Sequence, residues 1–551
     1  NSRISLTNND AGGSGGSDGL SANTIFGYLA GEDIADGGVD NTYFGHKAGS
    51  NNATGDDNVF IGSNAGKGAH GNSNSNNVGI GSDTMLTITT GSHNVAIGAA
   101  SLDALTTGGS NVAIGYAALS AAGAGESSNI AIGESSMTSA DEGSGSGNAI
   151  NTNIAIGVNS LTGGDFGSTG SRTLVDNIAI GTNALNSTGV NSQTGTIAIG
   201  SSALTALTSG AGNVAIGQNS SKAITTGAYN LALGANVLQH CLDGSYNIGI
   251  GFGAMSDWDV DGGTSTAVDG SNNNVMIGVN AGGGAWTNVQ SNFNVGIGNY
   301  VMDAAMDGAL NNTGVGHSSL SALTTAINNT AIGHNALLVN QTGGYNTAVG
   351  ATALDACTGA QNTAVGWASG GAIIGGQNNT CVGTNGNNIT TGSQNVCIGD
   401  TATVLTVGGN NQTVIGYGTA GKGANTVTLG NDAVTDVYAN QDGTATTHSQ
   451  VVEGAGVSLA DDATISVATN NLGGAFISVY ENGAGVGGIF YASFSTGSGT
   501  IKIQGDATVV NADTDGNLCV YKSDDNHTVT IKNRLGATKS IYWSAWGARV
   551  N

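Results

Sequence analysis

The sequence predicts an all-β chain: a parallel β-solenoid shaft followed by a separate antiparallel, β-sandwich-like domain. A short motif of Asn, an apolar triplet and Gly recurs 23 times between Asn23 and Gly430, most often at a spacing of 17 residues. A fixed period of this size is typical of a solenoid, in which stacked coils bury a continuous apolar column. The chain has 95 glycines and no proline, which suits a backbone whose N–H groups lie mostly in hydrogen-bonded ladders.

The motif is seen most clearly in residues 111–119, Asn-Val-Ala-Ile-Gly-Tyr-Ala-Ala-Leu. The apolar triplet is too short for a helix and is bounded by turn residues, which favours a strand. Side chains alternate along a strand, so Val112 and Ile114 share one face and Ala113 takes the other. We expect the larger Val/Ile face to lie inside the coil and the small Ala face to form a close contact between chains.

Three further positions of the motif have expected roles. Asn precedes the triplet in 20 of the 23 copies, and its amides can bond from coil to coil; the exceptions are Thr196, Gln412 and Thr426. The Gly supplies a permissive backbone for a corner. Four residues later, Leu or Met in 13 copies predicts a second buried position on a returning strand.

The repeat resembles a known family architecture. Residues 329–337, Asn-Thr-Ala-Ile-Gly-His-Asn-Ala-Leu, show the pattern at its most regular. It is similar to the left-handed parallel β-roll of YadA-like trimeric adhesin heads, and closer to long bacteriophage tail fibres with repeats of this kind. The resemblance implies a homotrimeric β-roll over residues 23–430. The present unit is longer than that of the adhesin heads.

The pattern divides the chain into four parts. Residues 1–22 are an entry segment, 23–430 the repeats, 431–450 a connector without the triplet, and 451–551 a C-terminal β-domain, which we expect to bind a receptor or to cap the trimer. In the last part we expect strands at residues 476–480, 489–494, 500–504, 518–522, 528–532 and 540–546. Three long repeats place insertions at 139–151, 163–175 and 257–273, which we expect to emerge as surface loops.

Charge and composition limit the partners. The formal net charge is −25 with an isoelectric point near 4.2, so we expect no binding to nucleic acid or to anionic membranes. No apolar run approaches 18 residues, so no membrane-inserted helix is expected. Five scattered cysteines are not a disulfide framework. Cys381 and Cys397 replace the small Ala in successive coils; we interpret them as buried apolar residues, with a disulfide or metal between coils as the alternative.

The cofactor that the sequence suggests is a calcium ion. Asp257, Asp259 and Asp261 alternate before a Gly, and such carboxylates can converge on calcium. The alternative is a solvated acidic loop. Residues 511–515 contain a weaker copy of this pattern.

Receptor binding is predicted at the C-terminal end, where aromatic and cationic residues gather. Six of the 12 Lys and Arg lie in the last 50 residues, whereas the repeats are acidic and poor in aromatics. Such a surface suits sugars or anionic envelope groups. The candidate receptor-binding residues are Tyr542, Trp543, Trp546, Arg534, Lys539 and Arg549. Burial in the core or at the trimer contact is the alternative for the two tryptophans.

We interpret no motif in the sequence as an enzyme active site. Gly416 to Lys422 matches a phosphate-binding loop by letters, but Gly423 stands where Ser or Thr is needed and no helix follows. We therefore expect a structural and adhesive protein: a homotrimeric phage tail fibre, located in the virion tail, that contacts other tail proteins and a host surface glycan or envelope receptor. The alternatives are the passenger head of a bacterial trimeric adhesin on the cell surface, disfavoured because residues up to Asn551 show no membrane anchor, and a fibre-borne polysaccharide depolymerase.

Overall fold

The computed structural model describes residues 22–34, 38–143, 147–167, 171–257, 270–286, 289–385, 389–405, 408–434, 452–459, 462–468, 472–481, 487–493, 500–505, 509–510, 517–522, 528–535, 537 and 539–549. Every regular element in these residues is a β-strand. The chain divides into two compact units, residues 1–431 and 432–551. The predicted entry segment, apart from Ala22, and most of the connector lie outside the described residues.

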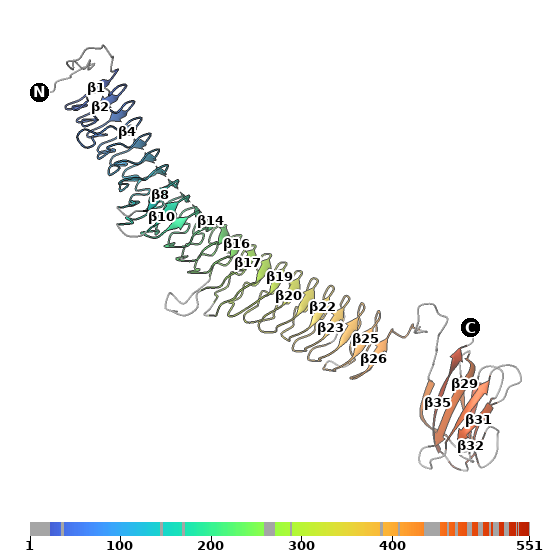
Figure 1. The fold of residues 1–551 in the computed structure, drawn as a ribbon. Helices are drawn as coiled ribbons and strands as arrows, with labels where there is room; N and C mark the ends of the chain where they lie inside the picture. The colour runs from blue at the N-terminus through green and yellow to red at the C-terminus, as the bar shows by residue number, and fades with distance from the viewer. Residues whose placement is uncertain are drawn as a thin grey trace. The chain divides into compact units, whose positions relative to one another are not determined.

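The first unit is a parallel β-solenoid, which confirms the predicted fold class (Figure 1). Each copy of the motif contributes one three-residue strand to a 23-stranded parallel sheet. The strands of this sheet are β1 (Thr24–Phe26), β2 (Thr42–Phe44), β3 (Val59–Ile61), β4 (Val78–Ile80), β5 (Val95–Ile97), β6 (Val112–Ile114), β7 (Ile130–Ile132), β9 (Ile154–Ile156), β11 (Ile178–Ile180), β13 (Ile197–Ile199), β14 (Val214–Ile216), β15 (Leu231–Leu233), β16 (Ile248–Ile250), β17 (Val275–Ile277), β18 (Val295–Ile297), β19 (Thr313–Val315), β20 (Thr330–Ile332), β21 (Thr347–Val349), β22 (Thr363–Val365), β23 (Thr380–Val382), β24 (Val396–Ile398), β25 (Thr413–Ile415) and β26 (Val427–Leu429).

Neighbouring strands pair in register, so identical motif positions form columns along the solenoid. In β6 and β7, for example, Ala113 lies opposite Ala131 and Ile114 opposite Ile132. A coil therefore buries its side chains against the same positions of the coils before and after it. This arrangement gives repeat proteins their neighbour-by-neighbour stability.

The predicted inside and outside of the strand are reversed in the structure. Ala113 is fully buried within its own chain, whereas Val112 and Ile114 are half-buried and face outward. The reason is the space left by the residue six positions later: Leu119 fills the coil interior, so the facing strand position must be small. The Ala column is thus the floor of the coil and cannot be the contact between chains.

The first coils show the same packing with the sizes exchanged. At Tyr43 the strand position is large, and the position six residues later is Gly49, where a Cβ atom would lie 2.5 Å from the Tyr43 ring. Phe60 and Gly66 repeat the pattern, with 2.3 Å between the Phe60 ring and a Cβ at Gly66. One large and one small residue therefore share the interior of each such coil.

The Asn column forms the predicted amide ladder. The Asn111 side chain donates from Nδ2 to Asn94 Oδ1 at 3.1 Å and to the Glu126 carbonyl at 2.8 Å. Its Oδ1 accepts from the backbone N and from Nδ2 of Asn129, at 3.0 and 3.2 Å. Both hydrogens and both acceptor directions of the buried amide are used. The ladder therefore satisfies the hydrogen-bonding groups of a buried polar column.

The corner Gly is required for two reasons. Gly115 has φ +139°, and a Cβ there would lie 2.5 Å from the carbonyl oxygen of Gly133 in the next coil. The segment after this Gly is not the returning strand that the sequence suggested. Ala100 and Leu102, for example, adopt left-handed conformations with φ of 55° and 50°. Their N–H groups still bond to neighbouring coils, at the Ser82 and Ala118 carbonyls.

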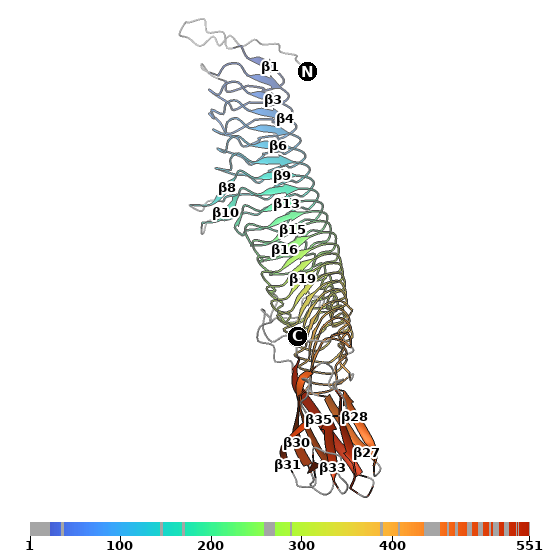
Figure 2. The same ribbon diagram turned by 90° about the vertical axis from the view of Figure 1, so that its right-hand side faces the viewer.

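Two of the predicted insertions are ordered into a second sheet and are not simple surface loops. Strands β8 (Ala149–Asn151), β10 (Thr173–Val175) and β12 (Gln193–Thr194) form a three-stranded parallel sheet in the order β12-β10-β8. Asp141 and Asp165 add an isolated parallel bridge. We call this addition the side lobe; β8 and β10 project from the row of solenoid strands in Figure 2. It stacks in the same direction as the coils that carry it.

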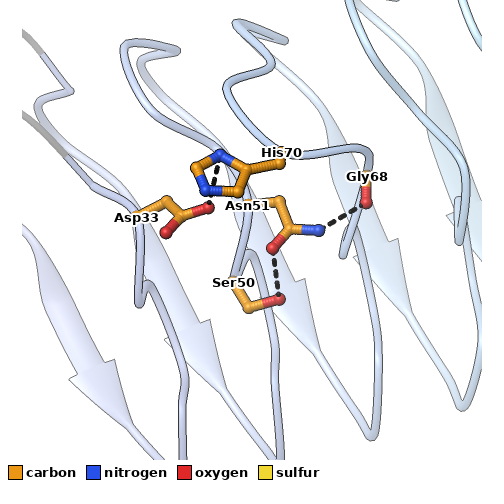
Figure 3. Close-up of polar contacts among 5 residues, drawn as sticks. All are labelled: Asp33, Ser50, Asn51, Gly68 and His70. Carbon is orange, nitrogen blue, oxygen red and sulfur yellow. Dashed lines mark hydrogen bonds and ion pairs between the residues drawn. The ribbon is translucent and has the colours of Figure 1, made fainter.

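Surface contacts also connect successive coils. Near the start of the solenoid, His70 reaches Asp33 at 3.2 Å, and between them Asn51 donates to the Gly68 carbonyl at 2.7 Å (Figure 3). The His70 side chain is 86% exposed, so this pair adds little stability. The buried columns, and not such pairs, hold the coils together.

The second unit contains two sheets. One is antiparallel with the order β27-β35-β29-β30-β31, and the other has the order β28-β34-β33-β32, in which β32 and β33 are parallel. The strands are β27 (Val452–Leu459), β28 (Thr464–Ala468), β29 (Leu472–Glu481), β30 (Gly487–Ser493), β31 (Thr500–Gly505), β32 (Val509–Val510), β33 (Leu518–Lys522), β34 (Thr528–Asn533) and β35 (Lys539–Arg549). Both sheets contribute to one core, which includes Ile477 and Phe490 from the first and Val520 and Ile531 from the second. The six strands expected from the sequence are all present.

Candidate functional surfaces

The most extensive functional candidate is the outer face of the 23-stranded sheet. We call it the outward stripe: the first and third residues of each of its strands, β1–β7, β9, β11 and β13–β26. These residues are half-buried or exposed in every strand, while the middle residue is buried in all but β26. In the single chain, 42% of Ile332 and 41% of Leu233 are exposed, large fractions for aliphatic side chains inside a sheet.

The stripe carries no charge. Two outward positions in each of 23 strands hold only Val, Ile, Leu, Phe and Thr, in a chain with 37 acidic residues. The first position is aliphatic from Val59 to Val295 and mostly Thr from Thr313 to Thr413, whereas the third position is apolar throughout. The stripe is therefore wholly aliphatic over β3–β18 and mixed, with hydroxyl groups, over most of β19–β25.

Its area exceeds what a monomer normally exposes. At about 4.8 Å per strand and about 7 Å between the two outward positions, 22 steps give a stripe roughly 105 Å long and on the order of 700 Å². Monomeric soluble proteins rarely show continuous apolar patches above a few hundred Å². An uncharged and largely apolar face of this size has the properties of an interface between chains.

Exposed aromatic residues flank the stripe, which the sequence interpretation did not anticipate. One set follows the corner Gly, and the other precedes the buried Asn. The Tyr229 and Tyr246 rings, each 57% exposed, stack with centroids 5.3 Å apart. His317 and His334 stack in the same way at 5.5 Å and are exposed. The signal was available in the sequence as aromatic residues recurring at two motif positions.

A carboxyl group with a strongly raised pKa, that of Glu126, lies beside the side lobe. Glu126 is fully buried, and its Oε1 accepts a hydrogen bond from the backbone N of Glu142 at 2.7 Å. Burial raises the pKa of Glu126 to about 7, and the neighbouring Glu142 carboxylate adds to the effect. Glu126 stands where most coils have Gly, in the column that continues with Ile150, Leu174 and Gln193. In these coils the Gly is therefore replaced by larger side chains, all of them buried.

The predicted calcium loop is described only at its first residue. Asp257 lies beside His240, with 3.5 Å between Asp257 Oδ1 and His240 Nδ1, and its carbonyl accepts from the backbone N of Trp286. Asp259 and Asp261 lie outside the described residues, as do Asp513 and Asp515 of the weaker copy. The buried Trp286, which the sequence interpretation missed, anchors the base of this insertion. The calcium site stays a prediction.

The predicted receptor-binding residues lie mainly on one strand of the second unit. Tyr542, Trp543, Trp546 and Arg549 belong to β35, and Lys539 begins it. Trp543 is partly buried and packs against the core, so it supports the fold. The side chains of Tyr542, Trp546 and Arg549 lie outside the described part of the structure.

Arg534 follows β34 and is held in place by two contacts. Its Nε lies 3.2 Å from Asp462 Oδ1, and its backbone N donates to the Asn517 carbonyl. The Asp462 side chain is 65% exposed, so the pair stays at the surface. Receptor binding by this group of residues stays a prediction.

The described residues show neither a metal-binding cluster nor a membrane-spanning helix. They contain no group of three or more His, Cys, Asp or Glu side chains placed to hold a metal ion. They also contain no helix with the length and hydropathy needed to cross a membrane. Comparisons with protein-family models, with curated proteins and with solved structures found no match.

Proposed function

We propose that this chain is a homotrimeric fibre protein of the phage tail-fibre type, with the solenoid as shaft and residues 451–551 as the part that binds a host surface glycan or envelope receptor. The observation that carries the proposal is the outward stripe. It continues along all 23 strands, so a partner that covers it must itself be long and apolar. A second and third copy of this chain, aligned in parallel, meet that requirement at every coil.

Charge supports the same arrangement. Each chain carries a formal charge of −25, so three chains carry 3 × −25 = −75 and repel one another wherever acidic surfaces meet. The stripe is the face on which no Asp or Glu occurs, so assembly through it keeps the acidic side chains in water. The number three rests on the resemblance of the repeat to trimeric adhesin heads and tail fibres.

The test of assembly compares two columns of the same three coils. In the stripe variant, three outward residues are changed to Lys: Ile180→Lys, Ile199→Lys and Ile216→Lys. In the control variant, the exposed residues two positions later receive the same change: Thr182→Lys, Ser201→Lys and Gln218→Lys. We expect light scattering to give a trimer mass for the unmodified chain and the control, and a lower mass for the stripe variant. A monomeric unmodified chain, or a stripe variant that assembles normally, would exclude this interface.

The buried Ala column provides a second comparison. Ala215→Arg places a charge inside the coil, because Ala215 is fully buried in its own chain. Burying an unpaired charge is costly, so this variant should lose the circular dichroism of folded coils and not merely its partners. If Ala215→Arg separates folded chains, the contact between chains lies on the Ala face after all.

The test of recognition uses the full chain with a specific protease site introduced between residues 440 and 445. The labelled protein is applied to a panel of bacterial strains before and after cleavage. On a strain that binds the intact protein, residues 451–551 should stay bound after cleavage and the solenoid should be released. Three binding domains on one fibre raise a weak affinity through effective concentration. If the solenoid stays bound and the C-terminal part is released, the side lobe becomes the better candidate for receptor binding.

A further inference from the structure

Two cysteines face each other inside the last part of the solenoid. Cys381 of β23 lies directly opposite Cys397 of β24 in the parallel register. Both are 1% exposed and occupy the inward position that is usually Ala. Because the strands are parallel and in register, both side chains point into the coil from adjacent levels.

The spacing of the two residues suits a covalent bond. Adjacent strands of a sheet lie about 4.8 Å apart, within the roughly 4.4–6.8 Å that separates Cα atoms in disulfides. The Cβ atoms of a disulfide must approach to about 3.8 Å, so the two coils have to close slightly at this point. A bond under such strain is more easily reduced than an unstrained one.

The chemistry of the pair differs from that of the other thiol in this region. A hydrogen bond from Cys381 lowers the pKa of the Cys397 thiol, and burial opposes this effect. By contrast, burial raises the pKa of Cys357 to about 11, and its Sγ contacts the Gly359 carbonyl and Asn362 Nδ2. The thiolate is the nucleophile in disulfide exchange, so Cys397 is the better attacking group.

The pair lies where the Asn ladder ends. Asn395, in the same coil as Cys397, is the last Asn of the column. In the next coil Gln412 makes the backbone bond to Asn395 Oδ1 at 2.9 Å, but its Nε2 is buried and has no partner among the described residues. Thr426 replaces Asn in the coil after that. Terminal repeats lack a neighbour on one side, so this end of the stack is the weaker part of the solenoid.

We propose that Cys381 and Cys397 are joined by a reversible disulfide that fastens the last coil of the Asn ladder to the coil before it. The oxidant is a small disulfide such as oxidised glutathione. The Cys397 thiolate attacks one glutathione sulfur and releases one glutathione thiolate, which leaves a mixed disulfide. The Cys381 thiolate then attacks the Cys397 sulfur and releases the second glutathione thiolate. The two thiol protons end on the two glutathione molecules, and the protein sulfurs are oxidised as glutathione is reduced.

Access to the thiols depends on opening of the end of the solenoid. Among the described residues, two strands of this sheet, β25 and β26, follow β24 in the stack. Opening of these coils exposes the Cys397 level without unfolding the rest of the shaft. We therefore expect slow oxidation of the native protein, faster oxidation in mild denaturant, and complete oxidation when the chain folds in the presence of oxidised glutathione.

The test is a cross-link map of the full chain. The protein is refolded with oxidised glutathione, alkylated, digested without reduction and analysed by mass spectrometry. We expect one intramolecular cross-link, between the peptides containing Cys381 and Cys397, and slower amide exchange in β23–β25 than in the reduced protein. Cys357→Ala should keep the cross-link, and Cys397→Ala should lose it. Ala is the usual residue at the Cys397 position, so that variant should fold.

Three results would overturn the proposal. The first is alkylation of both Cys381 and Cys397 after refolding in oxidised glutathione. The second is a cross-link from either residue to Cys357. The third is a cross-link that joins two chains, which denaturing gel electrophoresis without reductant detects as a dimer.

Discussion

The Asn ladder predicts that replacing one buried donor atom, Asn111 Nδ2, by an oxygen destabilises the solenoid in a pH-dependent way. In Asn111→Asp, one carboxylate oxygen can still accept the two hydrogen bonds from Asn129. The other oxygen takes the place of Nδ2. It faces two acceptors, Asn94 Oδ1 and the Glu126 carbonyl, which lie 3.1 and 2.8 Å from Nδ2 in the unmodified chain. The ionised form is therefore repelled, whereas the protonated form can still donate one hydrogen bond.

The expected magnitude follows from the number of bonds. Asn111→Ala removes four side-chain hydrogen bonds, and at about 1 kcal/mol each this variant should lose about 4 kcal/mol of stability. Asn111→Asp should lose a similar amount at neutral pH and much less near pH 4. The sign follows from linkage: the pKa of the buried Asp is raised above its unfolded value of about 3.9, so stability is present below that value and is lost as pH rises.

The assay is thermal unfolding followed by circular dichroism between pH 4 and pH 8, with the unmodified chain as reference at each pH. Thr196→Asn is the matched control. The Thr196 Oγ1 is buried with no partner among the described residues, and Asn there would continue the ladder from Asn177. We expect this change to stabilise the solenoid by about 1–2 kcal/mol. An Asn111→Asp variant whose midpoint follows the reference at every pH would show that the amide bonds do not support the stack.

Three further predictions concern the interior of the solenoid and its insertions. Burial raises the pKa of Glu126 from 4.5 to about 7, so the free energy of unfolding of the unmodified chain should fall by about 3 kcal/mol as pH rises from 4.5 to 7. Glu126→Gln should remove this pH dependence in the same melting series. Gly49→Leu should clash with the Tyr43 ring, and Tyr43→Ala should leave a cavity. The double variant recreates the Ala/Leu pairing of other coils, so a double-mutant cycle should give a favourable coupling above about 2 kcal/mol. Additive effects of the two changes would refute the shared interior. If the Asp257 loop binds calcium, the ion should raise the melting temperature, and identical melts in calcium and in chelator would exclude the site.

The sequence could identify the residues of the candidate functional surfaces, but not which of their side chains are buried and which are exposed. The recurring aliphatic residues on either side of Ala113 located the strand and the candidate interface. They did not show which face of the strand points outward. The C-terminal strands were predictable because each is a run of apolar and β-branched residues between turns. The partly buried position of Trp543 was not, because the residues packed against it come from strands that are distant in sequence.

The sequence by itself determined the period, the strands, the corner glycines and the Asn ladder, because each depends on one residue type repeated at one position. Those features are local or are copied from coil to coil, so the repeat contains the information. The tertiary structure alone decided what faces inward. By hydrophobicity Val and Ile are the natural interior, but Leu119 is fully buried in the coil interior, so only a small residue fits at the inward strand position. Space, and not hydrophobicity, therefore placed Ala113 inside and left Val112 and Ile114 on the outer face.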